Sequence, residues 1–203
     1  VGITRARLSE PVLPGQVVGQ LTREAADALG LSPNVRVVAG GMDQATGSVG
    51  AGNIRPGMIS ETTGAALAIQ ATIHAPHLDP TGRLPVNVHS VRDMFLFEPV
   101  CPTGGMALRW FRDQFGQAEM RAAREQNRDA YDLLGELAAT IDPGCEGLTL
   151  LPHLMGAYSP EYNADARGVF YGFTLRHTKA HFARAILEAI AFMLKRNLDL
   201  MQS

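Results

Sequence analysis

The segment VVAGGMDQATGSVGAG, residues 37–52, holds the densest information in the chain. Its first residues complete a β-branched run that begins at Val35, and Gly40–Gly41 end that run. Such a run predicts a short buried strand that delivers the residues after it to the edge of a sheet. The residue delivered is Asp43, and the two glycines allow a ligand to approach the backbone beside its carboxylate.

Asp43 has two interpretations. A carboxylate in this setting can orient the hydroxyl of an alcohol and accept its proton during phosphoryl transfer, while Gln44 can donate to and accept from a neighbouring hydroxyl. Alternatively, Asp43 caps a helix over Gln44–Val49, a role that Asp often has. Spacing alone favours the cap, and both interpretations stay open at this point.

Strands and helices alternate on both sides of this segment. Upstream, Val12–Val18 is extended and Thr22 caps a short helix that ends at Gly30. Downstream, the patterns predict strands over residues 58–60, 65–73, 94–100 and 148–151, and helices over residues 106–115, 131–141 and from 178 to the last residues. Interleaved strands and helices predict an α/β or mixed layered domain.

Two glycine turns are candidates for phosphate binding. Thr62-Thr63-Gly64 joins two strands, and Thr103-Gly104-Gly105 precedes the helix that contains Trp110. At the second turn we expect exposed N–H groups, which attract anions at the positive end of a helix. Gly-Gly before a helix is common in α/β domains, so this pattern is weak by itself. It is not a Walker loop, because no Gly-Lys-Ser/Thr follows.

Composition excludes several classes of function. The 203 residues include 18 basic and 20 acidic side chains with no basic stripe, so we expect no nucleic-acid partner. Apolar runs are shorter than a membrane span, and we expect a soluble, cytoplasmic protein. Cys101 and Cys145 are far apart and are expected to be reduced thiols. His177 and His181 lack a surrounding zinc motif, and we expect no metal ligands among them.

Three stretches resemble the FGGY carbohydrate kinases, most closely the xylulokinase-like branch. They are residues 37–52, GLTLLPHLMGAYSP at 147–160, and the signature pattern at 168–188. The resemblance covers nearly the whole chain. It implies an actin-like ATPase, ribonuclease H-like α/β fold, mostly the second (C-terminal) domain and truncated at both ends. Residues 1–52 would end the first, sugar-binding domain and carry the catalytic Asp, and residues 53–203 would form an incomplete nucleotide-binding domain.

The resemblance also implies roles for single residues. Asp43 matches the general base, Gln44 a sugar contact, and Thr63 and Gly64 the second phosphate turn, whereas Gly104–Gly105 match a position near the nucleotide phosphates. The implied ligands are ATP, Mg²⁺ and a small sugar or polyol, and a homodimer is the assembly we consider. The 203 residues alone are expected to be inactive, because positioning and charge stabilisation need parts that lie outside them.

The chain departs from the family pattern at Phe173, where a smaller aliphatic residue is usual, and at two places that bear on function. The phosphate turn reads Gly64-Ala65-Ala66 where a hydroxyl residue is usual, and Thr63 or Thr62 would have to replace that hydroxyl. The loop Gly156–Pro160 lacks the Glu-Arg pair of xylulokinases, which argues against xylulose as the sugar. An alternative function is therefore a catalytically impaired member that serves as a sugar-binding or regulatory module. A third is a scaffold domain without a ligand.

Overall fold

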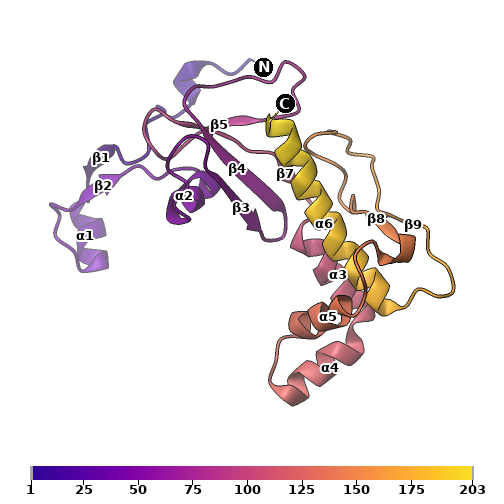
Figure 1. Ribbon diagram of the computed structural model, residues 1–203. Coiled ribbons are helices and arrows are strands. Elements are labelled where there is room, and N and C mark those ends of the chain that lie inside the picture. Colours follow the sequence, from indigo (N-terminus) through magenta and orange to yellow (C-terminus); the bar gives the residue numbers. More distant parts are fainter. Residues whose placement is uncertain (1, 203) are drawn as a thin grey trace.

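The computed structural model describes residues 2–202, and its centre is a five-stranded antiparallel sheet (Figure 1). The strand order is β3-β4-β6-β5, and β7 pairs with the other end of β4. The strands are β3 (Ile59–Thr63), β4 (Leu67–Ile73), β5 (Val86–Val88), β6 (Phe95–Phe97) and β7 (Val100–Cys101). The central strand β4 is buried on both faces over almost its whole length, whereas β3 is an exposed edge.

The predicted strands exist, and the structure differs from the prediction in their bounds and in two additional short strands. The two strands predicted over residues 58–60 and 65–73 exist as the β3–β4 hairpin, but Thr62 and Thr63, predicted to lie in the connection, extend β3 and pair with β4, so the turn is formed by residues 64–66. The strand predicted over residues 94–100 is divided into β6 and β7, because Pro99 has no N–H to donate to a ladder. Strand β5 and a further short strand, β9 (Val169–Tyr171), were not predicted, since three residues are too few to establish a period.

A helical layer stands beside the sheet. It contains α3 (Gly105–Phe115), α4 (Gln117–Gln126), α5 (Ala130–Ala139) and α6 (Lys179–Gln202), together with the short hairpin of β8 (Thr149–Leu151) and β9 (Val169–Tyr171). The long helix α6 runs from this layer up to the sheet (Figure 1). Helices α3, α5 and α6 and strand β8 share one apolar core, formed by Ala107, Phe111, Leu134, Ala138, Leu150, Ala183, Ile186 and Ala189.

The two adjacent histidines serve the start of α6. His181 Nδ1 accepts from the Thr178 amide at 3.1 Å, which fixes the first turn of the helix. His177 Nδ1 accepts from the Thr174 amide at 2.8 Å, and its Nε2 therefore carries the hydrogen that points to the Cys145 carbonyl at 3.2 Å. Both rings thus have structural partners.

The N-terminal segment forms a small unit that projects from the sheet (Figure 1). It consists of a hairpin of β1 (Val17–Gln20) with β2 (Arg36–Val38), and α1 (Arg23–Leu29). A 3₁₀ turn at Arg5–Arg7 precedes this unit and lies apart from it, near the N-terminus (Figure 1). The predicted cap of α1 is confirmed, because Thr22 accepts from the Ala25 amide and Gly30 adopts φ 66°.

The prediction of a buried strand before Asp43 is wrong for this structure. Strand β2 pairs only with β1, and every residue of both strands is exposed, including Val38 at 53%. The β-branched run makes a strand, as its propensity dictates. Its burial would need a second layer, and no described element covers this hairpin.

Candidate active site

Helix α2 (Asp43–Gly50) starts directly after the Gly40–Gly41 turn. Met42 is its N-cap and gives no side-chain cap, so Asp43 is the first helical residue rather than the cap. The Asp43 carboxylate accepts from the Gln44 amide at 2.7 Å and is exposed. Its charge is favourable at the positive end of the helix. The second carboxylate oxygen has no partner in the described part of the chain, so a ligand can reach it.

A chain of polar side chains lies between α2 and the sheet. Gln44 Oε1 accepts from Gln70 Nε2 at 3.2 Å, and Gln70 is only 1% exposed on β4. The Ser60 hydroxyl lies 3.4 Å from Gln70 Oε1 and 3.3 Å from the hydroxyl of Ser48, which is on the buried side of α2. Residue Gln44, the predicted sugar contact, is therefore held in place from below by the sheet.

The network continues to the far end of α2 through Asn53. Its side-chain amide donates to the Ser60 hydroxyl at 3.0 Å and to the Gln70 carbonyl at 2.9 Å, and its Oδ1 accepts from the Thr72 hydroxyl at 2.7 Å. His89 Nε2 donates to the Asn53 carbonyl at 3.0 Å, since its Nδ1 accepts from the Val91 amide. All of these side chains except Ser60 are at most 2% exposed. Buried groups that are fully paired in this way fix one geometry.

Sequence reasoning missed this network, although a signal existed. Strand β4 reads LAIQATI, and a glutamine and a threonine inside an apolar strand that is buried on both faces need partners. Asn53 follows the Gly52 turn and gave no such signal.

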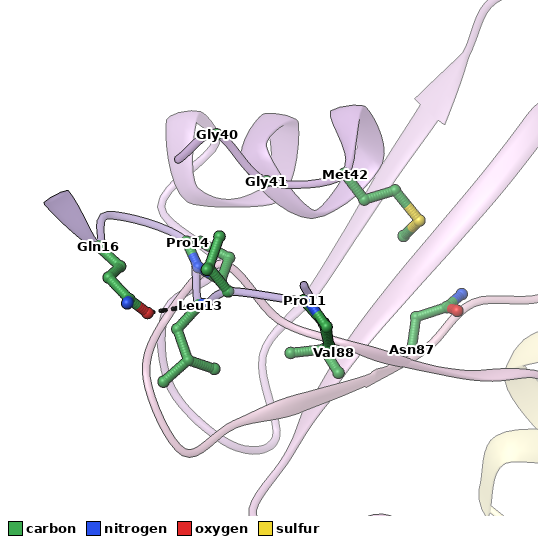
Figure 2. Close-up of a pocket in the computed structure, with 10 residues that line it drawn as sticks. Pro11, Leu13, Pro14, Gln16, Gly40, Gly41, Met42, Asn87 and Val88 are labelled. Carbon is green, nitrogen blue, oxygen red and sulfur yellow. Dashed lines mark hydrogen bonds between the residues drawn. The ribbon is translucent and has the colours of Figure 1, made fainter. Parts of the chain in front are cut away.

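A cavity of about 460 Å³ opens beside the start of α2 (Figure 2). In Figure 2, the Met42 side chain extends toward Asn87 of β5, and the proline-rich segment before β1 forms the facing wall. Gln16 accepts from the Leu13 amide at 3.2 Å, which shapes that wall. The lining is mostly apolar: Pro11, Val12, Leu13, Pro14, Gln16, Gly40, Gly41, Met42, Asn87 and Val88.

A buried carboxylate stands behind Asn87. Asn87 Nδ2 donates to Glu98 Oε2 at 2.6 Å, and Glu98 is 6% exposed. Burial raises the pKa of Glu98; the hydrogen bond from Asn87 opposes this shift, and the negative charge of Asp43 adds to it. Glu98 directly follows β6, and the sequence gave no reason to single it out.

The two glycine turns are packed against each other. The amides of Gly104, Gly105 and Met106 donate to the carbonyls of Ala65, Gly64 and Ala65 at 3.0, 2.9 and 3.2 Å. A Cβ on Gly104 would lie 2.5 Å from the carbonyl carbon of Ala66, and one on Gly105 would lie 2.5 Å from the Gly64 oxygen. The expectation of free amides at the start of α3 is therefore wrong, because the hairpin uses them.

The free amides lie instead at the tip of the β3–β4 hairpin. The N–H groups of Ala65 and Ala66 have no acceptor among the residues described, and Ala65 is exposed. Thr63 donates its hydroxyl to the Glu61 carboxylate on the same strand. Gln70, below α2, lies five positions after Ala65 in the sequence, a distance of about 16 Å along a strand. The predicted site residues therefore form two separate groups. Asp43 and Gln44 lie at the start of α2, above Gln70 of β4, and Gly64 lies with Gly104–Gly105 at the tip of the β3–β4 hairpin.

The described side chains were compared with the groupings that bind metal ions in proteins. Within residues 2–202, no three His, Cys, Asp or Glu side chains are grouped so that they could hold a metal ion.

Comparison with known proteins identifies the family. The sequence model for the C-terminal domain of the FGGY family of carbohydrate kinases matches residues 58–203. The chain belongs to this family. It is similar to a gluconokinase of Bacillus subtilis, with 34% identity over 95% of this chain and 37% of the relative. It is also similar to a xylulose kinase of Lactococcus lactis, with 32% identity over 98% of this chain and 38% of the relative.

Solved structures of FGGY kinases confirm the fold. The xylulose kinase of Rhodospirillum rubrum superposes with a TM-score of 0.83 at 29% identity, over 98% of this chain and 38% of that one. The gluconate kinase of Lactobacillus acidophilus gives 0.75 at 25% identity, over 89% and 35%. The chain therefore has the actin-like ATPase fold of the FGGY C-terminal domain, as predicted, and spans a little over a third of its relatives' length. None of the described helices is both long and apolar enough to cross a membrane.

Proposed function

We propose that this chain is part of a longer kinase that transfers the γ-phosphoryl group of ATP to a hydroxyl of a small sugar, sugar acid or polyol. The family match over residues 58–203 is the observation that carries this proposal. The substrate range follows the relatives, which include gluconokinases and xylulose kinases. Gly156–Pro160 lacks the Glu-Arg pair of xylulokinases, which favours a substrate other than xylulose.

Asp43 is the proposed general base. Its exposed carboxylate has one oxygen fixed by the Gln44 amide and the other open to a ligand. As the substrate oxygen bonds to the γ-phosphorus, the hydroxyl proton passes to this open oxygen, and the bond from the γ-phosphorus to the bridging oxygen breaks to release ADP. Gln44, held by Gln70, positions a neighbouring substrate hydroxyl.

The phosphate side of the site is proposed at the hairpin tip. When bound, ATP supplies the phosphoryl group, and the unpartnered amides of Ala65 and Ala66 are donors that fit its anionic oxygens. The Thr63 hydroxyl and Gly64 lie beside them, and Gly104–Gly105 allow the chain to pass closely behind. The described residues supply no ligand set for Mg²⁺, so we assign none of them to the metal.

The domain assignment belongs to the same proposal. Residues 1–52 end the sugar-binding domain, and residues 53–203 belong to the nucleotide-binding domain. A cytoplasmic location is supported by Cys101 and Cys145, both free and buried, because such thiols suit a reducing compartment. Partners are the sugar and ATP, and a homodimer is one assembly open to test.

A second candidate function is that of a catalytically impaired sugar-binding or regulatory module. The observation that favours it is the Gly64-Ala65-Ala66 sequence, which offers backbone amides but no hydroxyl at the tip. Under this alternative the protein binds the sugar and shows no turnover.

The test is ATP turnover by the full-length protein that contains this chain, with gluconate, pentuloses, hexuloses and polyols as acceptors. Asp43→Asn keeps the size of the side chain, and we expect kcat to fall by about 10²- to 10⁴-fold with the melting temperature unchanged. Asp132→Asn, an equally exposed aspartate on α5, is the matched control and should retain full activity. We expect the 203-residue chain alone to show no turnover. Sugar binding without turnover in the unmutated full-length protein would refute the kinase and support the binding module.

A further inference from the structure

The side-chain amide of Gln44 has a partner at one end only. Its Oε1 accepts from Gln70 Nε2 at 3.2 Å, and Gln70 is 1% exposed on β4. Its own Nε2 has no hydrogen-bond acceptor in the described part of the chain. Gln44 is half-buried and directly follows the exposed Asp43. The N–H₂ group is therefore the part of this amide that is available to a ligand.

The orientation of the Gln70 amide follows from neighbours that can bond in one way. Asn53 Nδ2 lies 2.9 Å from the backbone carbonyl of Gln70, which can only accept, so this end of the Asn53 side chain is a donor. The same group donates to the Ser60 hydroxyl at 3.0 Å. Because Ser60 accepts from Asn53, its own hydrogen is free for another acceptor, and Gln70 Oε1 lies 3.4 Å away. With its Oε1 turned to Ser60, Gln70 turns its Nε2 to Gln44.

Ser48 supports the same direction of donation. Its hydroxyl donates to the Gln44 carbonyl at 2.9 Å, so toward Ser60, at 3.3 Å, it is an acceptor. The Ser60 hydrogen is thus shared between two acceptors, the Ser48 hydroxyl and Gln70 Oε1. Every donor from Asn53 to Gln70 then has an acceptor, and the series of bonds ends at the Gln44 oxygen.

We propose that Gln70 is a positioning residue that fixes the direction of the Gln44 amide: it occupies the amide oxygen, so Gln44 meets the substrate with its N–H₂ group as a donor. The substrate atom at this place is then an oxygen that accepts, from a hydroxyl, a carbonyl or a carboxylate group, and an ammonium group does not fit. This inference rests on the proposed kinase function, because it assumes that the sugar binds beside Asp43. An amide without such a partner turns between orientations, since its last torsion has a broad, roughly two-fold preference. Fixing one orientation before the substrate arrives reduces the entropy lost on binding.

Hydrogen exchange of side-chain amides tests the orientation without turnover. It can be measured by NMR on the full-length protein made with isotope-labelled glutamine. In the free protein we expect the Gln70 amide protons to exchange slowly, because Gln70 is buried and donates to Gln44, and the Gln44 protons to exchange at least about tenfold faster. A sugar from the acceptor panel should then slow the exchange at Gln44. Slow exchange at Gln44 in the free protein, unchanged by any sugar of the panel, would show the reverse orientation and overturn the proposal.

Steady-state kinetics test whether Gln70 acts through Gln44. Gln70→Leu keeps the approximate volume and removes the hydrogen bond, so we expect the KM for the sugar to rise about three- to tenfold, as for the loss of one neutral hydrogen bond, with kcat within about twofold. Gln44→Leu should raise KM at least as much. In the double variant, Gln70→Leu should add nothing further, because its effect passes through Gln44.

A control and two outcomes complete the kinetic series. Gln126→Leu, the same substitution at an exposed position of α4, should leave KM unchanged. A wild-type KM in folded Gln70→Leu protein, or additive effects in the double variant, would leave Gln70 with a structural role and overturn the proposal. Should Gln70→Leu fail to fold, the exchange measurement on the unmutated protein still decides.

The exchange measurement also separates this inference from the kinase proposal. A sugar that slows exchange at Gln44 in a protein without turnover would refute the kinase and leave the donor role of Gln44 standing. Turnover by a protein whose Gln44 protons are already protected before sugar is added would refute the donor role alone.

Discussion

Replacing Gly104 by alanine tests the contact between the two glycine turns. An added Cβ would lie 2.5, 2.6 and 2.8 Å from the carbonyl carbon of Ala66, the amide of Leu67 and the carbonyl oxygen of Ala66. Carbon atoms pack at about 3.5–4.0 Å, so the turns must separate by about 1 Å. The three hydrogen bonds from residues 104–106 to the hairpin would then be lost or strained. At about 1 kcal/mol each, we expect a loss of about 3 kcal/mol.

The loss is measurable as a fall in melting temperature. For a domain of this size, 1 kcal/mol corresponds to about 2–4 °C, so Gly104→Ala should melt about 6–12 °C lower. Hydrogen exchange should also show lost protection at the amides of residues 104–106. The matched control is Gly135→Ala in α5, where an added Cβ has no atom within 4 Å and should stabilise by about 0.5–1 kcal/mol. A Gly104→Ala protein that melts within 2 °C of the wild type and keeps its amide protection would refute the reasoning.

Two further predictions concern the core and a surface loop. Leu134→Ala removes a side chain that is 0% exposed in the helical core and should lower the free energy of unfolding by about 2–5 kcal/mol. The control Leu175→Ala, at a fully exposed site, should change this free energy by less than about 0.5 kcal/mol. Equal effects of the two substitutions on thermal unfolding would contradict the assignment of this core. The hydrogen bond from the Thr81 hydroxyl at 2.6 Å, together with those from the amides of residues 81, 83 and 84, lowers the pKa of Asp79 from 3.8 to about 2. Because the folded pKa lies below the ordinary value, the stability it contributes is complete above about pH 4 and disappears as the pH falls through about 2. The difference in melting temperature between wild type and Asp79→Asn should therefore shrink between pH 5 and pH 2, and a constant difference would contradict this.

The regular elements of this chain were predictable where local chemistry decides them. The Thr22 cap, the Gly30 terminus and the amphipathic helices α3 and α6 follow from side chains within one or two turns. The β3–β4 hairpin follows in the same way, because Gly64 separates two segments that favour strands. The predictions failed where a residue distant in the sequence determines the structure. The exposure of β2 depends on which elements cover it, and β5 forms because β6 pairs with it.

The candidate site shows the same division. A glycine turn that is local in sequence singled out Asp43 and Gln44 as candidates, and the family resemblance supplied their predicted roles. The buried Gln70 and Asn53 and the Asn87–Glu98 pair depend on contacts between residues 11 to 26 positions apart, and no spacing rule reveals them. The amides of Gly104 and Gly105 were misjudged for a related reason, because the acceptors that use them lie 39 to 41 residues earlier in the chain.

Helix α2 contacts the sheet mainly through hydrogen bonds between side-chain amides and hydroxyls, and less through apolar side chains. Apolar contacts allow a helix to rotate slightly at a small cost in free energy, since dispersion has no preferred direction. Directional bonds such as those from Gln70 to Gln44 and from Asn53 to the Gln70 carbonyl do not, and they leave a single angular setting for the helix. Substitutions at Pro11–Gln16 or Val88 can therefore change the shape of the cavity wall while the orientation of the Asp43 side chain is preserved. A fold built in this way can change the shape of the cavity without changing the orientation of the proposed base, Asp43.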